Sequence, residues 1–118
     1  MGPARSSQSS LFSRRFRVLQ IIWRFRSKPE RVAEFRRVYG NHGPWAKLFQ
    51  ISPEYRGTKL LEDVADPLEF VVIDEWASVD SFSRFKHEHG RSYELLDQQC
   101  LELTDNETLI GNFISEAG

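Results

Sequence analysis

The stretch from Glu69 to Gly90 constrains the fold most, because its residue pattern changes from strand to helix within a few positions. Its first part, FVVIDEW, is rich in β-branched and aromatic residues and predicts a buried strand. Side chains alternate between the two faces of a strand, so every second residue of this run shares a face. One face carries Phe70, Val72, Asp74 and Trp76. The strand therefore presents a carboxylate and an indole on the same side.

A helix is expected directly after this strand. Ser78 suits the N-cap position, and an apolar stripe follows it at helical spacing. The stripe consists of Phe82, Phe85 and His89. His87 points to another side of such a helix, which argues against a metal site that uses both imidazoles. We therefore expect Trp76, Asp74 and His89 to meet near one strand-to-helix junction, the best candidate site in the chain.

Length and composition predict one compact domain. The chain has 118 residues, 40% of them hydrophobic, enough for a core without disulfides or a structural metal. Residues 1–15 are rich in Ser and Arg and are expected to form a disordered tail before a single domain at 16–118. Cys100 is the only cysteine, so a reducing, cytoplasmic location is expected. No apolar run reaches the roughly 20 residues that span a bilayer, and no membrane partner is expected.

Charge is unevenly distributed along the chain, although the net charge is −1. Residues 1–37 carry ten Arg or Lys and two acids, whereas residues 38–118 carry six basic and fifteen acidic residues. Such a basic segment can bind nucleic acid or membrane, or it can neutralise acids elsewhere on the folded surface or across a dimer. The basic residues are dispersed and lack the stacking aromatics of a single-strand groove. We therefore expect neutralisation and no nucleic-acid partner.

The other segments complete an alternating order of strands and helices. Strands are expected at 16–26, 55–64 and 107–114, and helices after Pro29, from Pro44, at 79–89 and at 91–103. Gly40 suits a left-handed helix terminator, and Gly90 is expected to break the long helical pattern. The second strand has mixed polarity and is expected near an edge. A short turn joins it to the third strand, so these two should pair antiparallel.

The order strand, helix, strand, strand, helix, strand predicts an α+β, ferredoxin-like fold: a four-stranded antiparallel sheet with the helices on one face. The opposite face of this sheet is also apolar, with Val18, Ile22, Val71 and Ile73 on it. A large bare apolar patch is unusual on a soluble monomer. We therefore expect a homodimer in which two sheets pack face to face.

Several motifs together resemble the antibiotic-biosynthesis-monooxygenase-like (ABM) proteins of the dimeric α/β-barrel superfamily. They are DEWASVDSF (74–82), GPWAKLF (43–49), YRGTKLL (55–61) and YELLD (93–97). The resemblance covers roughly residues 16–114. It implies a pocket between the sheet and the helices, where some members oxidise flat phenolic molecules with oxygen and no cofactor and others degrade haem. Trp76 matches a Trp found in both activities.

The chain also departs from the pattern of this family. Oxygenating members tend to pair the Trp with a strand Asn and with a phenol or Arg from the next helix, where this chain has Val72 and Phe82. Haem-degrading members have an Asn in the first strand, and the nearest amide here is Gln20. Two functions therefore stay open. One is a monooxygenase-like enzyme for a small aromatic molecule, and the other is a non-catalytic homodimeric module that binds a small ligand or haem.

The candidate residues each have a structural alternative. Trp76 is a core indole or a pocket wall, and Asp74 is a general base or a hydrogen-bond partner of a helix residue such as Tyr39. His89 is a proton carrier, a haem ligand or a partly buried imidazole. Cys100 lies on an apolar stripe and is expected to be inert. The residues expected to contact the ligand are Trp23, Tyr39, Trp45, Phe82 and Phe85.

Overall fold

The computed structural model describes residues 17–115; the predicted tail at 1–15 and Phe16 of the predicted first strand lie outside them. These described residues form nine elements, two of them short 3-10 helices labelled η. They are β1 (Val18–Ser27), η1 (Pro29–Arg31), α2 (Val32–Tyr39), α3 (Pro44–Phe49), β2 (Tyr55–Glu62), β3 (Glu69–Trp76), α4 (Val79–Cys100), η2 (Leu101–Leu103) and β4 (Thr104–Ser115).

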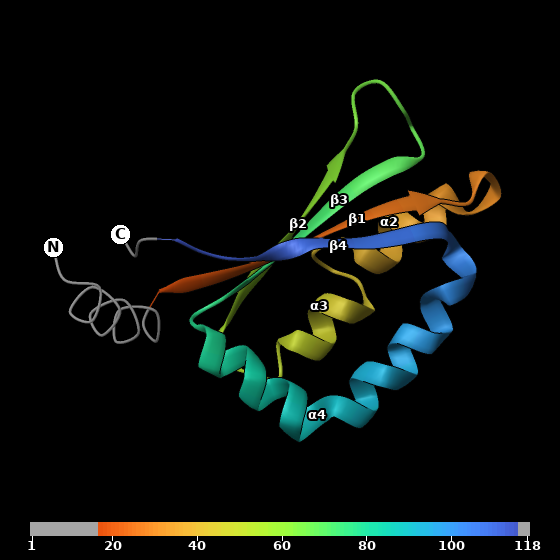
Figure 1. Cartoon of the computed structure of the whole chain (residues 1–118). Coiled ribbons are helices and arrows are strands. Elements are labelled where there is room, and N and C mark those ends of the chain that lie inside the picture. Colours follow the sequence, from red (N-terminus) through yellow and green to blue (C-terminus); the bar gives the residue numbers. More distant parts are fainter. Residues whose placement is uncertain (1–16, 116–118) are drawn as a thin grey trace, which may run out of the picture.

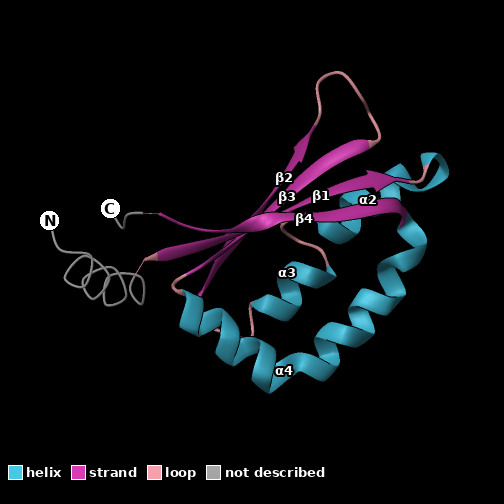
Figure 2. Ribbon diagram, in the orientation of Figure 1, coloured by secondary structure: helices cyan, strands magenta, loops and turns pink. Residues whose placement is uncertain are grey.

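The four strands form one antiparallel sheet in the order β2-β3-β1-β4. The helices all lie on one side of it (Figures 1 and 2). β2 is an edge strand and pairs antiparallel with β3, as predicted. This is the α+β, ferredoxin-like arrangement that the order of elements predicts. In the central pair, Phe25 lies opposite Phe70 and Leu19 opposite Trp76.

The core lies between the sheet and the helices, and aromatic rings dominate it. Phe35 of α2 is completely buried, with its ring 4.7 Å from that of Phe70 and 4.5 Å from that of Tyr39. The Phe25 ring lies 4.7 Å from the Tyr39 ring. Such pairs add about 0.5–1.5 kcal/mol each beyond the burial of their apolar area. The helix-facing sides of β1 and β3 are therefore fixed against α2 by direct ring contacts.

α4 begins with the cap that the sequence predicts and continues past the predicted break. The Ser78 hydroxyl accepts a hydrogen bond from the Ser81 N–H, and the Ser81 hydroxyl accepts one from the Ser78 N–H, both at 3.0 Å. The predicted break at Gly90 is confirmed as a kink one residue earlier, where the non-helical backbone of His89 (φ −123°, ψ 23°) separates two helical segments that together span 22 residues. Glycine weakens a helix by about 1 kcal/mol but does not end it when tertiary contacts hold both sides.

In residues 17–115 no helix is long and apolar enough to cross a bilayer.

The turn between α2 and α3 depends on two glycines for close backbone approach. The prediction that Gly40 is left-handed is wrong, because its backbone is extended (φ −76°, ψ 174°). A Cβ atom on Gly40 would lie 2.8 Å from the Arg36 carbonyl oxygen. One on Gly43 would overlap the carbonyl oxygens of Arg37 and Val38. These glycines bring the start of α3 against the end of α2.

Ion pairs join the basic N-terminal part of the domain to the acidic remainder, which confirms the predicted neutralisation. The side chain of Arg24 lies 2.8 Å from the Glu69 carboxylate. The equivalent distance is 2.8 Å between Arg36 and Glu62. A third pair joins Arg26 and Asp66 at 2.9 Å. Exposed pairs of this kind contribute roughly 0–1 kcal/mol each, so they order the surface more than they stabilise the fold.

The sheet face opposite the helices is apolar and uncovered by any other element of residues 17–115 (Figure 1). Strand alternation and register place on it Val18, Ile22, Leu61, Val71, Ile73 and Phe113. Leu61 is 47% exposed and Phe113 is 48% exposed. Charged side chains lie among and around these residues, because the register places Arg24 opposite Val71 and Lys59 opposite Ile73 on the same face. We refer to it below as the open sheet face.

Candidate functional site

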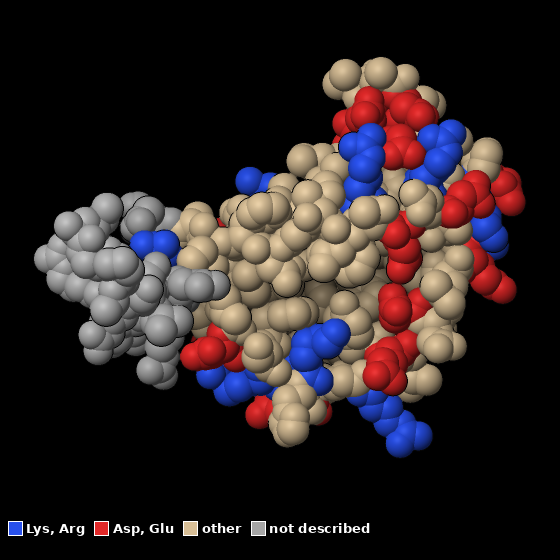
Figure 3. Space-filling model, in the orientation of Figure 1, with Lys and Arg blue, Asp and Glu red and all other residues tan. Residues whose placement is uncertain are grey.

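A cavity of about 40 Å³ lies between the sheet and α4. It is lined by Trp23, Phe25, Tyr39, Trp45, Val72, Tyr93, Asp97 and Glu107. Six elements contribute to this lining, so the site forms only when the chain is folded. In Figure 3 the surface is hollowed between β4 and α4, and acidic side chains stand along one side of the hollow. A bound water takes about 30 Å³, so the empty cavity has room for one or two waters.

The inner wall of the cavity combines rings with a buried hydrogen-bond donor. Trp45 is 8% exposed, and its indole N–H has no hydrogen-bond partner of normal geometry among residues 17–115. The Tyr39 hydroxyl and the Cys100 thiol lie beside it. Burial raises the pKa of both groups, that of Tyr39 far above its usual value of 10. A weak hydrogen bond with the Trp45 side chain, outside normal geometry, opposes the rise in both. Tyr39 therefore stays a neutral phenol that can donate or accept a hydrogen bond.

The mouth of the cavity carries two carboxylates. Glu107 lies opposite Phe25 on the neighbouring strand and is half-buried, whereas Asp97 is exposed on α4. Burial and, to a lesser extent, the negative charge of Asp97 raise the pKa of the Glu107 carboxyl. Burial likewise raises the pKa of Tyr93 to about 12, and the negative charges of Asp97, Asp74 and Glu107 add to the effect. The mouth is therefore negatively charged and only partly hydrated.

Trp76 lies outside this cavity, in a second cluster of rings. It is completely buried, and its ring centroid lies 5.4 Å from that of Phe49, 5.3 Å from that of Phe82 and 5.1 Å from that of Phe85. Its indole N–H has no hydrogen-bond partner among residues 17–115. His89 lies at the bend of α4, with its ring 5.1 Å from that of Phe85. These ring contacts place Trp76 inside the core and His89 at the edge of the core.

Asp74 faces the helices, as predicted, but its partner is a strand residue and not Tyr39. The Thr58 hydroxyl donates a hydrogen bond of 2.6 Å to the Asp74 carboxylate, and the Tyr55 hydroxyl is hydrogen-bonded to the Thr58 oxygen. Burial raises the pKa of Asp74 to about 6, and the Thr58 hydrogen bond opposes the rise. Thr58 lies directly opposite Asp74 in the register of β2 and β3, which explains the contact.

The structure thus divides the predicted site residues into two groups. Trp23, Tyr39 and Trp45 meet at the cavity, whereas Trp76, Phe82, Phe85 and His89 form the second cluster. Phe49 lies between the groups, because its ring contacts those of Trp45 and Trp76 at 5.7 and 5.4 Å. In residues 17–115 no three His, Cys, Asp or Glu side chains are close enough to hold a metal ion.

Three residues of the cavity lining were not among the predicted site residues: Tyr93, Asp97 and Glu107. Tyr93 and Asp97 are four positions apart and so share one side of α4, a spacing that could have been recognised. The sequence offers no comparable signal for Glu107. Its direction depends on the register of β4 against β1, which shifts at a bulge between the partners of Ile22 and Trp23.

Comparison with known proteins identifies the fold. No protein-family model matches the chain, and neither does any curated protein. Solved structures do match. One is a mutant of SnoaB, a cofactor-independent oxygenase from Streptomyces nogalater (20% identity, TM-score 0.66, 86% of this chain and 95% of that one).

Two further matches are putative antibiotic biosynthesis monooxygenases. The protein from Bordetella bronchiseptica is 16% identical, with a TM-score of 0.63 over 82% of this chain and 95% of its own. The one from Nitrosomonas europaea is 13% identical, with a TM-score of 0.60 over 86% of this chain and 90% of its own. The chain therefore has the fold of the ABM-like proteins of the dimeric α/β-barrel superfamily, which confirms the resemblance at the level of the fold.

Proposed function

We propose that the protein is a monooxygenase-like enzyme that acts without a cofactor on a flat aromatic, phenolic molecule in the cavity between the sheet and α4. The observation that carries this proposal is an aromatic cavity with a half-buried carboxylate, Glu107, at its mouth. The similarity to SnoaB, described as a cofactor-independent oxygenase, supports the choice of reaction. Fold similarity alone would not be enough to assign this reaction, because one fold hosts many activities.

The chemistry needs a base, an oxyanion partner and a dry site. Glu107, whose pKa burial raises, removes a proton from the ring CH₂ carbon of the substrate's keto tautomer, and both hydrogens of this carbon end in the water that is formed. The electron-rich anion that results reduces O₂. One oxygen atom bonds to that carbon as a carbonyl, the other leaves as water, and the substrate supplies all the electrons. The Trp45 N–H and the Tyr39 hydroxyl hydrogen-bond the developing oxyanion, because both are donors at the inner wall.

The substrate must enlarge the cavity when it binds, because about 40 Å³ does not hold an aromatic ring. Trp23 and Tyr93 are the half-buried rings of the lining and are the side chains that can move. Tyr93 lies on the part of α4 beyond the bend at His89. The catalytic roles expected for Trp76, Asp74 and His89 stay predictions, since Phe49 lies between Trp76 and the cavity.

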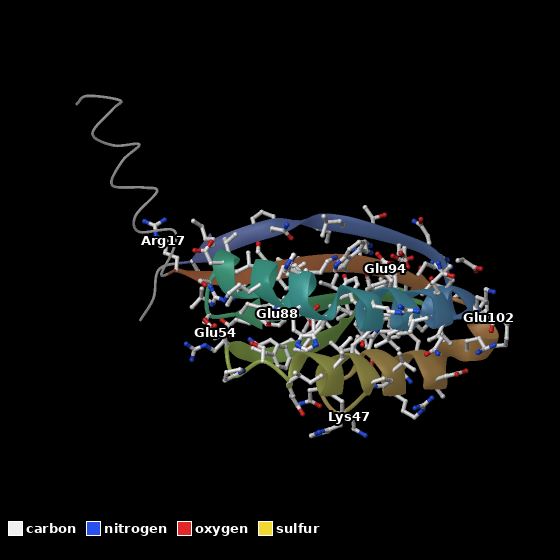
Figure 4. The ribbon with its side chains drawn as sticks, turned by 90° about the horizontal axis from the view of Figure 1, so that it is seen from below. Arg17, Lys47, Glu54, Glu88, Glu94 and Glu102 are labelled. Carbon is white, nitrogen blue, oxygen red and sulfur yellow. The ribbon has the colours of Figure 1, made fainter. Side chains whose placement is uncertain are left out.

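We expect Glu107→Gln to lower the oxygenase rate by about 10²- to 10⁴-fold, the usual contribution of a general base. The measurement is oxygen consumption with a panel of hydroxylated polycyclic phenols, with and without a chelator. Glu88→Gln is the matched control, because it removes the same charge from an exposed position on α4 (Figure 4). Activity of Glu107→Gln equal to that of the control would exclude Glu107 as the base. Absence of oxygen uptake with every phenol would contradict the proposed activity.

A non-catalytic ligand-binding module is the second candidate, and Val72 favours it. This buried side chain lines the cavity at the position where the resemblance leads one to expect a polar strand residue in oxygenating members. Haem ligation through His89 fits less well, because its ring packs on Phe85 and does not line the cavity. Binding of a phenol without any oxygen uptake would favour this second function.

We also propose that two copies pack through the open sheet face as a homodimer, because this face is rich in apolar residues, with charged side chains among and around them. We expect Ile73→Asp to weaken association at least 100-fold, since an unpaired charge buried in an interface costs about 3–5 kcal/mol. Light scattering over a concentration series measures the change. Leu95→Asp, an exposed apolar position on α4, is the control. A monomer at micromolar concentration without any substitution would contradict this arrangement.

A further inference from the structure

The two carboxylates at the cavity mouth have no arginine partner, unlike several other acidic side chains of the domain. Glu62, Asp66 and Glu69 each lie within 3 Å of an arginine nitrogen. Asp97 and Glu107, by contrast, make no hydrogen bond or ion pair with any of residues 17–115. Both line the same cavity. Two carboxylates that face one partly buried space without an ion-pair partner repel each other, and a positively charged ligand group would relieve the repulsion.

The opposite end of the cavity has a donor without a well-aligned acceptor. Trp45 is more than nine-tenths buried and lines the cavity; its indole N–H makes no hydrogen bond of normal geometry to residues 17–115, although the Tyr39 hydroxyl and the Cys100 thiol lie close to it. A buried donor without a well-aligned partner is unfavourable, so an acceptor atom of a ligand would be stabilised there. The Tyr39 hydroxyl beside it can donate as well. The cavity is therefore polar at both ends, with donors inside and negative charge outside.

Rings fill the space between these two ends. Phe25 and Val72 are buried on the sheet side, and Tyr93 closes the α4 side with its ring 5.0 Å from that of Trp45. One cation lies near the mouth, since the Lys86 ammonium group is 3.9 Å from the Tyr93 ring centroid. It packs on that ring and makes no ion pair with Asp97 or Glu107 among the described residues. The two carboxylates therefore outnumber it.

We propose that the cavity selects phenols that carry a protonated alkylamine, and that it rejects phenols that carry a carboxylate. This inference rests on the proposed function, because it assumes that an aromatic ring occupies this cavity. The phenol oxygen accepts a hydrogen bond from the Trp45 N–H, and the ring lies between Phe25 and Tyr93. The ammonium group lies against Asp97 at the mouth, where the negative charge of Glu107 also attracts it without a direct ion pair.

Three small phenols of matched shape separate the ring from the charge. They are tyramine, neutral 4-propylphenol and 3-(4-hydroxyphenyl)propionate. Their affinities are measured by chemical-shift titration of the tryptophan indole N–H signals at low ionic strength, with the Trp45 signal assigned from Trp45→Phe. We expect tyramine to bind at least about tenfold more tightly than the propionate, because charges about 4 Å apart near a protein surface interact by up to a few kcal/mol. Added salt should reduce this ratio.

The variant Asp97→Asn/Glu107→Gln tests which residues produce the preference. We expect its tyramine-to-propionate affinity ratio to fall to about one, while Glu88→Gln, on the same helix, keeps the ratio of the unmodified protein. The single substitutions should give intermediate ratios. Because each ratio is taken within one variant, a general loss of ring affinity does not affect it.

The outcomes distinguish this inference from the proposed function. If 4-propylphenol shifts the Trp45 signal but the unmodified protein binds the propionate as well as tyramine, the charge preference is wrong and the aromatic site stands. A ratio that persists in the double variant also overturns the preference. If none of the three phenols shifts the Trp45 signal at millimolar concentration, the aromatic site and the inference both fail.

Discussion

Trp76→Ala is expected to lower the free energy of unfolding by about 3–5 kcal/mol, a large part of the roughly 5–15 kcal/mol that stabilises a domain of this size. Trp76 is completely buried, and four aromatic rings surround it at centroid distances of 5.1–5.4 Å. Alanine would leave a cavity that these neighbouring rings cannot fill without breaking their own contacts. Urea denaturation at neutral pH measures the change.

Trp76→Phe is the informative companion. Its expected effect is less than about 1.5 kcal/mol, because a ring stays in place and the substitution also removes an indole N–H that has no partner among the described residues. Leu95→Ala is a control for loss of an exposed apolar side chain. If Trp76→Ala cost less than about 1 kcal/mol, the ring would border solvent or a void, and the role of Trp76 as a ligand-contacting wall would gain support over its place in the core.

The order of elements could be predicted because it depends on local pattern. The strand period of FVVIDEW and the Ser78 cap lie within a few residues of each other, and both are confirmed. The alternation along this strand also correctly placed Asp74 and Trp76 on the helix-facing side. With two crossover helices, only a few sheet topologies are compatible with such an order. The fold could therefore be derived from a small set of local signals.

The composition of the cavity could not be predicted, because it depends on long-range geometry. Glu107 enters the cavity through the register of β4, and that register contains a bulge. Tyr93 and Asp97 line the cavity because α4 bends at His89. The sequence predicted a break at Gly90 but not the direction of the helix beyond it. Trp76, chosen for its chemistry at one junction, is separated from Trp45 by a single ring, Phe49. A shared face does not guarantee a shared cavity.

Asp74→Asn is expected to stabilise the protein at neutral pH by about 1–3 kcal/mol. Burial raises the pKa of Asp74 from 3.8 to about 6, so the folded protein holds an ionised carboxylate there at a disadvantage above that pH. One pKa unit corresponds to about 1.4 kcal/mol, and partial exposure of the side chain reduces the full effect. Asparagine has the same shape, carries no charge and can still accept the hydrogen bond from Thr58.

The pH dependence of this difference identifies its cause. The pKa of Asp74 is higher in the folded than in the unfolded protein, so between about pH 4 and pH 6 the folded state binds more protons. The stability of the unmodified protein therefore falls as pH rises through this range and then stays lower. Asp74→Asn lacks this contribution, so the two proteins should have similar stability near pH 4 and differ increasingly up to about pH 6.5. All other titrating groups are common to both and cancel.

Urea denaturation at several pH values measures the stability difference, and an NMR titration of the Asp74 carboxyl carbon measures its pKa. Two results would contradict this account: a stability difference that is constant from about pH 4 to pH 7, or a titration midpoint of Asp74 near pH 4. Either would show that the Asp74 carboxyl is hydrated and that burial does not raise its pKa.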